Sequence, residues 1–295
     1  MKALHSPFLR NTYEMLSQTL SQATAACYVE WMRRYILFHH FQELDAMRRD
    51  AQKLLQAFLL HLACDRNVSA RTQNQALAAI MTLYRDVLVE PLNIRHKSLK
   101  AKQPRNLPEA LHPEEYALVR EYLTGAGRLA ADLMFGSGLK VGECAALRCV
   151  DVDFQGGTLN VGDHWTILPD ALYGPLKRRM AFVKGCYRLK GMRDNNQYFV
   201  FPAQKLFDPD TDLGENDHIH RNTIQKAVEL AAQKARARQD SPLLKQGHCQ
   251  SLRDGFAVNS LRQGYTIRHV QEFLGQNDLR QTVKYLSFLP LGKLL

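Results

Sequence analysis

Apolar residues recur at steps of three and four along the first third of the chain, which is the spacing of amphipathic helices. The first such stretch covers residues 24–39 and the second covers residues 47–66. A third begins at Ser69, whose hydroxyl suits the N-cap position of a helix. The polar joints between the stretches are short, so the pattern predicts a small helical bundle.

The pattern changes after this bundle. Residues 95–108, "RHKSLKAKQPRNLP", are rich in Lys and Arg, contain two prolines and have almost no apolar periodicity. Such a segment is typical of an extended basic linker. Pro113 then suits the first turn of a helix that opens a second domain. We therefore expect a helical domain over residues 1–94, a linker over 95–108 and a second domain over 109–295.

Helical spacing dominates the second domain as well, with one short interruption. Residues 130–148 indicate two helices broken by a Gly-Ser-Gly turn. Residues 152–161 and 164–169 alternate as strands do, around a tight Gly-Asp connection. Residues 221–238 and 253–274 return to helical spacing. The predicted fold class is mainly α with a small antiparallel β-sheet.

The charge balance indicates what kind of partner to expect. The chain has 39 Lys and Arg against 29 Asp and Glu, a net charge of +10 and a pI near 9.4. Residues 1–106 carry 15 basic and 8 acidic side chains, so the first third is more basic than the rest. Excess positive charge suits a polyanion. Double-stranded DNA is such a partner, and the basic linker can lie along its phosphates.

Composition disfavours several other classes of protein. No apolar run approaches the roughly 20 residues that span a bilayer, and the polar start of the chain does not suit a secretory leader. We therefore expect a cytoplasmic protein with no membrane partner. The six cysteines form no CxxC pair, so neither disulfides nor a zinc site are expected, and the thiols should be buried. We expect no metal and no cofactor.

Three stretches of the second domain resemble the signature boxes of the tyrosine recombinases, the phage integrase family. They follow the family's order: "LMFGSGLKVGECAALRCVDVDF" at residues 133–154, "SLRDGFAVNSLRQGYTIRHVQEFLGQ" at 251–276 and "TVKYLSF" at 282–288. Other stretches, such as "YVEWMRRYILFH" and "RNVSARTQNQAL", resemble the integron integrases in particular. The resemblance implies an N-terminal helical core-binding (SAM-like) domain, an α+β catalytic-type domain and DNA strand exchange.

The family resembled here cleaves DNA with a tyrosine hydroxyl, which attacks the scissile phosphate and forms a 3′-phosphotyrosyl bond. Two arginines hold the non-bridging oxygens as charge develops on them. A lysine from a β-hairpin and a histidine move protons, and a further His or Trp completes the pocket. The resemblance implies that Tyr285 takes the nucleophile's place and that Arg253 matches the second arginine.

Several positions depart from the family's pattern. Lys140 stands where the family has its first arginine, and an ammonium cannot form the bidentate fork of a guanidinium. Gln250 and Gln276 stand where the family has histidines, and an amide cannot move a proton near neutral pH. Each loss should slow cleavage of DNA.

The predicted hairpin is a fourth departure, because it is short and has no lysine between Phe154 and Pro169. His164 could substitute for the lysine, although a histidine beside a tight turn is more often simply exposed. The four departures together predict very slow cleavage, with Tyr285 held only by packing. An active nucleophile is the alternative.

Binding to DNA rests mainly on phosphate contacts, so it can survive the loss of cleavage. Asn74 and Gln75, expected on the exposed side of a helix, carry amides that can read adenine edges, or they are ordinary solvated residues. The basic residues expected to contact phosphates are Arg33, Arg34, Arg71, Lys97, Lys100, Lys102 and Arg105.

Three hypotheses for function follow from these residues. The leading one is a site-specific DNA binder or regulator of the tyrosine recombinase family, closest to the integron integrases, with a degenerate cleavage site. The first alternative is a working recombinase with unusual residues. The second is an assembly partner of other recombinase protomers, because the apolar tail at residues 286–295 could dock on a neighbour and form a homo-oligomer on DNA, or it could dock back on its own domain.

Overall fold

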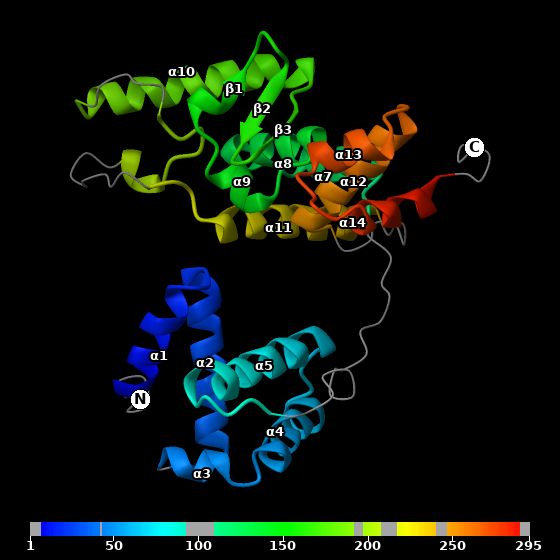
Figure 1. Cartoon of the computed structure of the whole chain (residues 1–295). Coiled ribbons are helices and arrows are strands. Elements are labelled where there is room, and N and C mark those ends of the chain that lie inside the picture. The colour runs from blue at the N-terminus through cyan, green and yellow to red at the C-terminus, as the bar shows by residue number, and fades with distance from the viewer. Residues whose placement is uncertain are drawn as a thin grey trace. The chain divides into compact units, whose positions relative to one another are not determined.

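The computed structural model divides into two compact units, Met1–Arg105 and Asn106–Leu295 (Figure 1). It describes residues 7–41, 43–92, 109–191, 197–207, 217–239 and 247–289. The expected basic linker, residues 95–108, lies outside these ranges, so its extended form stays a prediction.

The first unit is a helical bundle with more elements than the periodicity predicts. Its elements are α1 Pro7–Ser17, α2 Gln22–Phe38, α3 Leu44–Arg48, α4 Ala51–Cys64, α5 Ala70–Thr82 and a π-helical turn η2 Leu83–Val87. The three predicted helices correspond to α2, α4 and α5. Neither α1 nor α3 was predicted, because α1 buries only Leu9, Thr12 and Leu16, and α3 has only five residues.

Two tyrosines link the helices at the centre of this bundle. Tyr35 of α2 and Tyr84 of η2 are fully buried, and their hydroxyls are 2.9 Å apart. The Tyr84 hydroxyl donates to the carbonyl of Met47 at 2.7 Å. Burial raises the pKa of both tyrosines. The predicted N-cap is confirmed, since the amide of Thr72 donates to Ser69 Oγ at 3.3 Å.

The second unit is also mainly helical. Its helices are α7 Pro113–Glu121, α8 Gly125–Ser137, α9 Val141–Ala145, α10 Tyr173–Leu189, α11 Arg221–Gln239, α12 Cys249–Arg262, α13 Ile267–Phe273 and α14 Arg280–Val283. Short 3-10 turns are η3 Cys149–Asp151, η4 Asp170–Leu172, η5 Gln204–Phe207 and η6 Lys284–Phe288. In Figure 1, α10 and α11 lie along opposite edges of this unit with α8 and α9 between them.

The predicted hairpin is confirmed as part of a three-stranded antiparallel sheet. The strands β1 Val152–Asp153, β2 Thr158–Val161 and β3 His164–Ile167 pair in the order β1-β2-β3. In the β2–β3 pair, Val161 faces His164 across the turn. The fold class expected from the sequence, mainly α with a small antiparallel sheet, is therefore correct.

The helix predicted over residues 253–274 is wrong, because the chain turns in its middle. Gly264 has a φ of +97°, a left-handed conformation that glycine adopts without strain. Thr266 then caps a new helix, since the amide of His269 donates to its hydroxyl at 3.2 Å. The break separates α12 from α13 and turns the following chain back beside α12.

Helix α12 packs against α8 and is buried over most of its circumference. Close contact between them depends on Gly138, which ends α8 with a φ of +70°. A Cβ at this position would lie 2.4 Å from the ring of Phe256. The turn between α8 and α9 therefore lies directly beside α12.

The cysteines are less buried than expected. Cys144, Cys149 and Cys249 are buried, but Cys64 is exposed at the end of α4 and the remaining two are half-buried. Burial raises the pKa of the Cys249 thiol to about 12. No helix within the described ranges is both long and apolar enough to cross a membrane.

Replacing Tyr84 with Phe tests the buried tyrosine pair. The Tyr84→Phe variant loses the bond to Met47 and leaves the Tyr35 hydroxyl without its acceptor. We expect the free energy of unfolding of the first unit to fall by about 1–3 kcal/mol. Urea unfolding in a Trp165→Phe background measures it, because Trp31 then reports on this unit alone.

The control for this prediction is Tyr13→Phe, which removes the same hydroxyl from a half-buried ring of α1. Its unfolding free energy should change by less than about 0.5 kcal/mol. Equal losses in the two variants would show that the buried pair contributes nothing specific.

Candidate functional site

The structure brings the five residues expected at the cleavage site into one region of the second unit. Lys140 caps α9, Gln250 and Arg253 lie on α12, and Gln276 follows α13. Tyr285 lies on η6, which packs against α12. Residues that are 145 positions apart in the sequence, Lys140 and Tyr285, therefore belong to one site built around α12.

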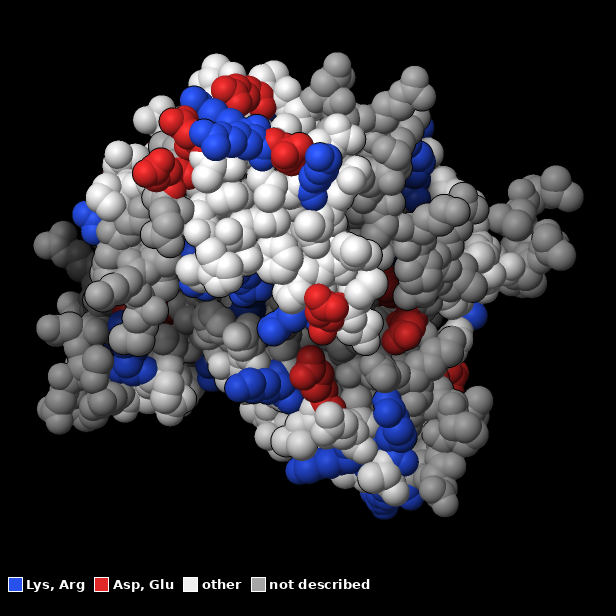
Figure 2. Space-filling view, turned by 90° about the horizontal axis from the view of Figure 1, so that it is seen from below, with Lys and Arg blue, Asp and Glu red and all other residues white. Residues whose placement is uncertain are grey.

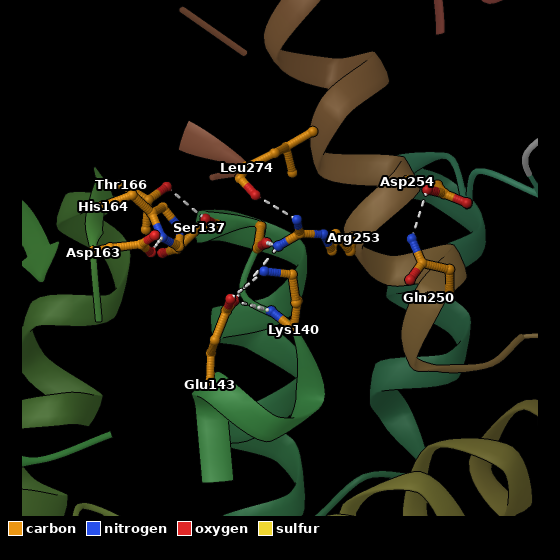
Figure 3. A network of polar contacts seen from close by, with 11 residues as sticks. Ser137, Lys140, Glu143, Asp163, His164, Thr166, Gln250, Arg253, Asp254 and Leu274 are labelled. Carbon is orange, nitrogen blue, oxygen red and sulfur yellow. Dashed lines mark hydrogen bonds and ion pairs between the residues drawn. The ribbon is translucent and has the colours of Figure 1, made fainter. Parts of the chain in front are cut away.

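Arg253 is the residue around which the site is organised (Figure 3). It is 4% exposed, and its two terminal nitrogens donate to the carbonyls of Gly138 and Leu274, each at 2.5 Å. Glu143 Oε2 lies 3.6 Å from Nη1. Burial lowers the pKa of Arg253, and the neighbouring Glu143 acts in the opposite direction. The guanidinium fork is therefore occupied by the protein's own main chain.

The side chain of Lys140 is bound to a carboxylate of the protein, Glu143. Its ammonium donates to Glu143 Oε1 at 2.6 Å, and its main-chain amide donates to Glu143 Oε2 at 2.7 Å. Glu143 thus lies between the charges of Lys140 and Arg253 (Figure 3). The lysine side chain is 54% exposed, so its ammonium can still approach an anion from solvent.

Tyr285 is buried completely, in an apolar cluster with Phe256 and Phe273. Its hydroxyl donates to Asp254 Oδ1 at 2.5 Å. Burial and the neighbouring carboxylate raise the pKa of Tyr285 far above that of a free tyrosine. In this arrangement the hydroxyl is a hydrogen-bond donor to the protein.

Asp254 is a site residue that the sequence reading missed. Its side chain is 5% exposed, and Gln250 Nε2 donates to the same Oδ1 atom at 2.9 Å. Lys284 Nζ lies 4.0 Å from that oxygen and 4.7 Å from the centre of the Tyr285 ring. The signal was present in "SLRD", where an acidic residue directly follows the retained arginine.

Gln276 contacts the segments on either side of it, α13 and the turn before Tyr285. Its side-chain oxygen accepts from Thr282 Oγ1 at 2.6 Å, and its main-chain carbonyl accepts from Gln271 Nε2 at 2.8 Å. A hydrogen bond between Gln276 and Tyr285 lowers the tyrosine pKa slightly against the larger effects of burial and Asp254. Gln276 therefore holds the Tyr285 segment close to α13.

His164 is not exposed, contrary to the expectation from its position beside a tight turn. Its side chain is only 12% exposed, because the hairpin packs on α13. The ring fits against Gly275, where a Cβ would lie 2.6 Å from Nδ1. His164 Nε2 and Ser137 Oγ are buried without a hydrogen-bond partner among the described residues. A histidine thus lies beside the turn that carries Gln276.

The residues expected to contact DNA in the first unit are only partly free. Arg33 and Arg34 both bind Glu30, at 2.8 and 2.9 Å. Their hydrogen bonds, that of Arg33 first, lower the pKa of Glu30 to about 2. Arg71 is exposed at the start of α5. The four linker residues Lys97, Lys100, Lys102 and Arg105 lie outside the described ranges.

The two amides proposed to read bases differ in exposure. Gln75 is exposed, and its side-chain oxygen accepts from Trp31 Nε1 at 3.4 Å. Asn74 is half-buried and has a partner, so the expectation that both lie on an exposed face is correct only for Gln75. Figure 2 shows separate groups of Lys and Arg on one face of the molecule, several of them next to Asp or Glu.

Two family models match nearly the whole chain. The model described as "Phage integrase, N-terminal SAM-like domain" matches residues 9–94. The model described as "Phage integrase family" matches residues 97–289. The chain belongs to the phage integrase family. This confirms the resemblance to the tyrosine recombinases, whereas the particular likeness to integron integrases stays a prediction.

Curated members of the phage integrase family align along most of this chain. An "Integrase/recombinase" of Escherichia coli is 29% identical over 300 residues, which cover 92% of this chain and 86% of the relative. A "Tyrosine recombinase XerC" of Bacillus subtilis (strain 168) is 27% identical over 290 residues, covering 92% and 88%.

Solved integrase-family structures share the fold. A XerH site-specific recombinase bound to a palindromic difH substrate matches with a TM-score of 0.65 and 19% identity, over 90% of this chain and 76% of that one. A lambda integrase dimer bound to a COC' core site matches with a TM-score of 0.65 and 15% identity, over 94% and 93%.

The described part of this integrase-family chain shows no cluster of three His, Cys, Asp or Glu side chains placed to hold a metal ion. The residues around α12 supply three cations, one buried tyrosine hydroxyl and two carboxylates, most of which already bind one another.

Replacing Arg253 with Lys tests the central role of its fork. A lysine can reach one of the two carbonyls that Arg253 binds, so at least one charged hydrogen bond is lost. We expect the second unit to lose about 2–3 kcal/mol of unfolding free energy. Urea unfolding followed by Trp165 fluorescence in a Trp31→Phe background measures it.

Arg268→Lys is the matched control, because Arg268 is exposed on α13 and binds only the side chain of Gln271. This variant should unfold with the parent protein. A loss in Arg253→Lys no larger than in the control would refute the structural role of the fork.

Proposed function

We propose that the chain is a site-specific binder of double-stranded DNA that has kept the integrase fold and lost efficient strand cleavage. It would act in the cytoplasm as a regulator or as an occupant of recombination sites. The observation that carries the proposal is the Tyr285 hydroxyl, which is buried and donates to Asp254 in place of facing a phosphate.

The altered residues support the loss of cleavage. Missing one positioned acid or base typically slows a reaction by about 10²- to 10⁴-fold, and missing one charge-stabilising donor slows it by about 10²- to 10³-fold. Lys140, Gln250 and Gln276 each represent such a change. The penalties are not additive in a set that acts as a unit. One such penalty alone, however, is enough to make cleavage slow.

Retained binding is supported by charge and by the relatives. A net charge of +10 suits DNA, and its contribution depends on salt and not on catalytic groups. The solved relatives described above were bound to DNA substrates, and we carry that partner over to this chain. Lys140 and Arg71 are exposed cations that can meet phosphates.

A working recombinase is the second candidate, and one contact favours it. The Asp254 carboxylate accepts a hydrogen bond from the Tyr285 hydroxyl at 2.5 Å. It could therefore also accept the hydroxyl proton when the tyrosine attacks phosphorus. The role of an assembly partner depends on the tail at residues 286–295. Its described part packs on its own domain, because Leu286, Phe288 and Leu289 lie against the cluster around Tyr285, and residues 290–295 lie outside the described ranges. That role, with its homo-oligomer on DNA, stays a prediction.

The proposed function is tested on the protein's own site. Selection from random duplexes recovers the bound sequence, which is then prepared as a nicked suicide substrate that traps any covalent adduct. We expect salt-sensitive binding and no adduct. An adduct that forms with the native chain and disappears in Tyr285→Phe would overturn the loss of cleavage, and absence of salt-sensitive binding would overturn the DNA role.

The contribution of a single phosphate contact is tested at Arg71. Arg71→Ala should weaken binding to all duplexes alike and reduce the slope of log affinity against log salt by about 0.9. Fluorescence anisotropy at several salt concentrations measures it. Arg85→Ala is the control, because Arg85 is exposed on the same unit but already binds Asp86 at 2.6 Å. Equal salt slopes for Arg71→Ala and the parent protein would show that Arg71 does not contact a phosphate.

A further inference from the structure

One oxygen of Asp254 is contacted by three side chains of the site. Asp254 follows Arg253 on α12 but points to another side of the helix (Figure 3). Tyr285 and Gln250 donate to the same oxygen, at 2.5 and 2.9 Å, and Lys284 lies 4.0 Å away. Asp254 is therefore the acceptor at the centre of a small network, in which Asp254 and Tyr285 are buried while Gln250 and Lys284 are exposed.

This network opposes the chemistry that the family's tyrosine performs. Cleavage requires the hydroxyl to give up its proton and bond to phosphorus, while the 5′-oxygen leaves with a proton. A carboxylate beside the hydroxyl holds that proton in the hydrogen bond and disfavours a tyrosinate by repulsion of like charges. The hydroxyl also points into the protein, where Tyr285 has no exposed surface. The charge of Asp254 and the buried position of the hydroxyl therefore both disfavour attack by Tyr285 on a phosphate.

We propose that Asp254 is a positioning residue that acts through Tyr285, holding the hydroxyl inside the protein as a latch. This inference rests on the proposed function and adds a fifth defect to the altered positions. Its consequence is specific: restoring Lys140→Arg, Gln250→His and Gln276→His leaves the site silent while Asp254 remains. Releasing the latch is needed as well.

The groups around Asp254 show why the latch holds. Gln250 has no charge and cannot take the place of Asp254 as an anion. Lys284 is 42% exposed, and its distance of 4.0 Å leaves most of the carboxylate's effect on the hydroxyl in place. Arg253 has its terminal nitrogens on main-chain carbonyls and does not hydrogen-bond the carboxylate. Within the described site, Gln250 shares Oδ1 with Tyr285 through a hydrogen bond, and Lys284 shares it only through a long ion pair.

The first test measures the reactivity of Tyr285 without DNA. Tetranitromethane modifies tyrosines that are accessible and can ionise, and mass spectrometry assigns each modified position. We expect Tyr285 to resist nitration in the parent and to react at least about tenfold faster in Asp254→Asn, equivalent to one unit of pKa. Asp254→Glu keeps the charge and should stay resistant. Unchanged resistance in Asp254→Asn would overturn the latch.

Three tyrosine and aspartate positions provide the controls. Tyr265 is 38% exposed and should react in every variant. Tyr116 is buried and donates to Asp132 at 2.6 Å, so its nitration would reveal general unfolding. Asp278→Asn makes the same charge change at an exposed site that binds Arg280, and it should leave Tyr285 resistant. If Asp254→Asn exposes Tyr116, Asp254→Ser is measured in its place against the same threshold.

The second test uses the nicked duplex that carries the selected site. The variant with Lys140→Arg, Gln250→His and Gln276→His should form little adduct, and adding Asp254→Asn should raise the rate at least about tenfold. Tyr285→Phe in that background should abolish the adduct. If the three restored residues cleave equally well with Asp254 present, the latch is refuted while the proposed function stands.

The same test separates the latch from proton acceptance. If Asp254 accepted the tyrosine's proton, Asp254→Asn would slow cleavage, which is the opposite sign from the latch. Adduct formation by the native chain would refute the loss of cleavage, and Asp254→Asn in that chain then decides the latch: a rate raised at least about tenfold supports it, and an unchanged rate refutes it. Where neither variant cleaves, the nitration rates decide, because they require no DNA.

Discussion

The second unit depends on one buried cation, Arg253. Its guanidinium binds the carbonyl that ends α8 and the carbonyl that follows α13, so three segments meet at one side chain. A buried charge is tolerated only when its donors are satisfied. These two carbonyls and the nearby Glu143 satisfy it, which fixes the positions of Lys140 and Gln276 on either side. Arg253, which we predict to match the family's second arginine, is thus a structural support.

Tyr285 shows the same double character with a different outcome. Its ring fills the apolar cluster beside Phe256 and Phe273, and its hydroxyl is satisfied by Asp254. Such a residue is worth keeping for packing and hydrogen bonding alone. The presence of a tyrosine in "TVKYLSF" therefore does not require that it attack DNA. The chemistry open to the Tyr285 hydroxyl depends on the group that it hydrogen-bonds, which is Asp254.

The sequence predicted those parts of the molecule that depend on local pattern or on family motifs. The hairpin around Gly162, the N-cap at Ser69 and the break after α8 followed from turn and capping residues. The parts that failed depend on contacts between distant segments. His164 is buried because the hairpin packs on α13, and Asp254 gains its role from a tyrosine 31 positions away. Neither contact leaves a periodic signal.

Binding and cleavage make separate demands on one fold, which is why one can persist without the other. Cleavage needs a hydroxyl, two proton carriers and two charged forks in one arrangement. A single buried carboxylate that binds the hydroxyl is therefore enough to disturb cleavage. Phosphate binding spreads over many exposed cations, each contributing a small, salt-dependent part. Asp254 lies in the protein interior with 3% of its surface exposed, where it can alter the first property without touching the second. If the proposed function holds, an interior change of charge would be enough to separate DNA binding from strand cleavage in this fold.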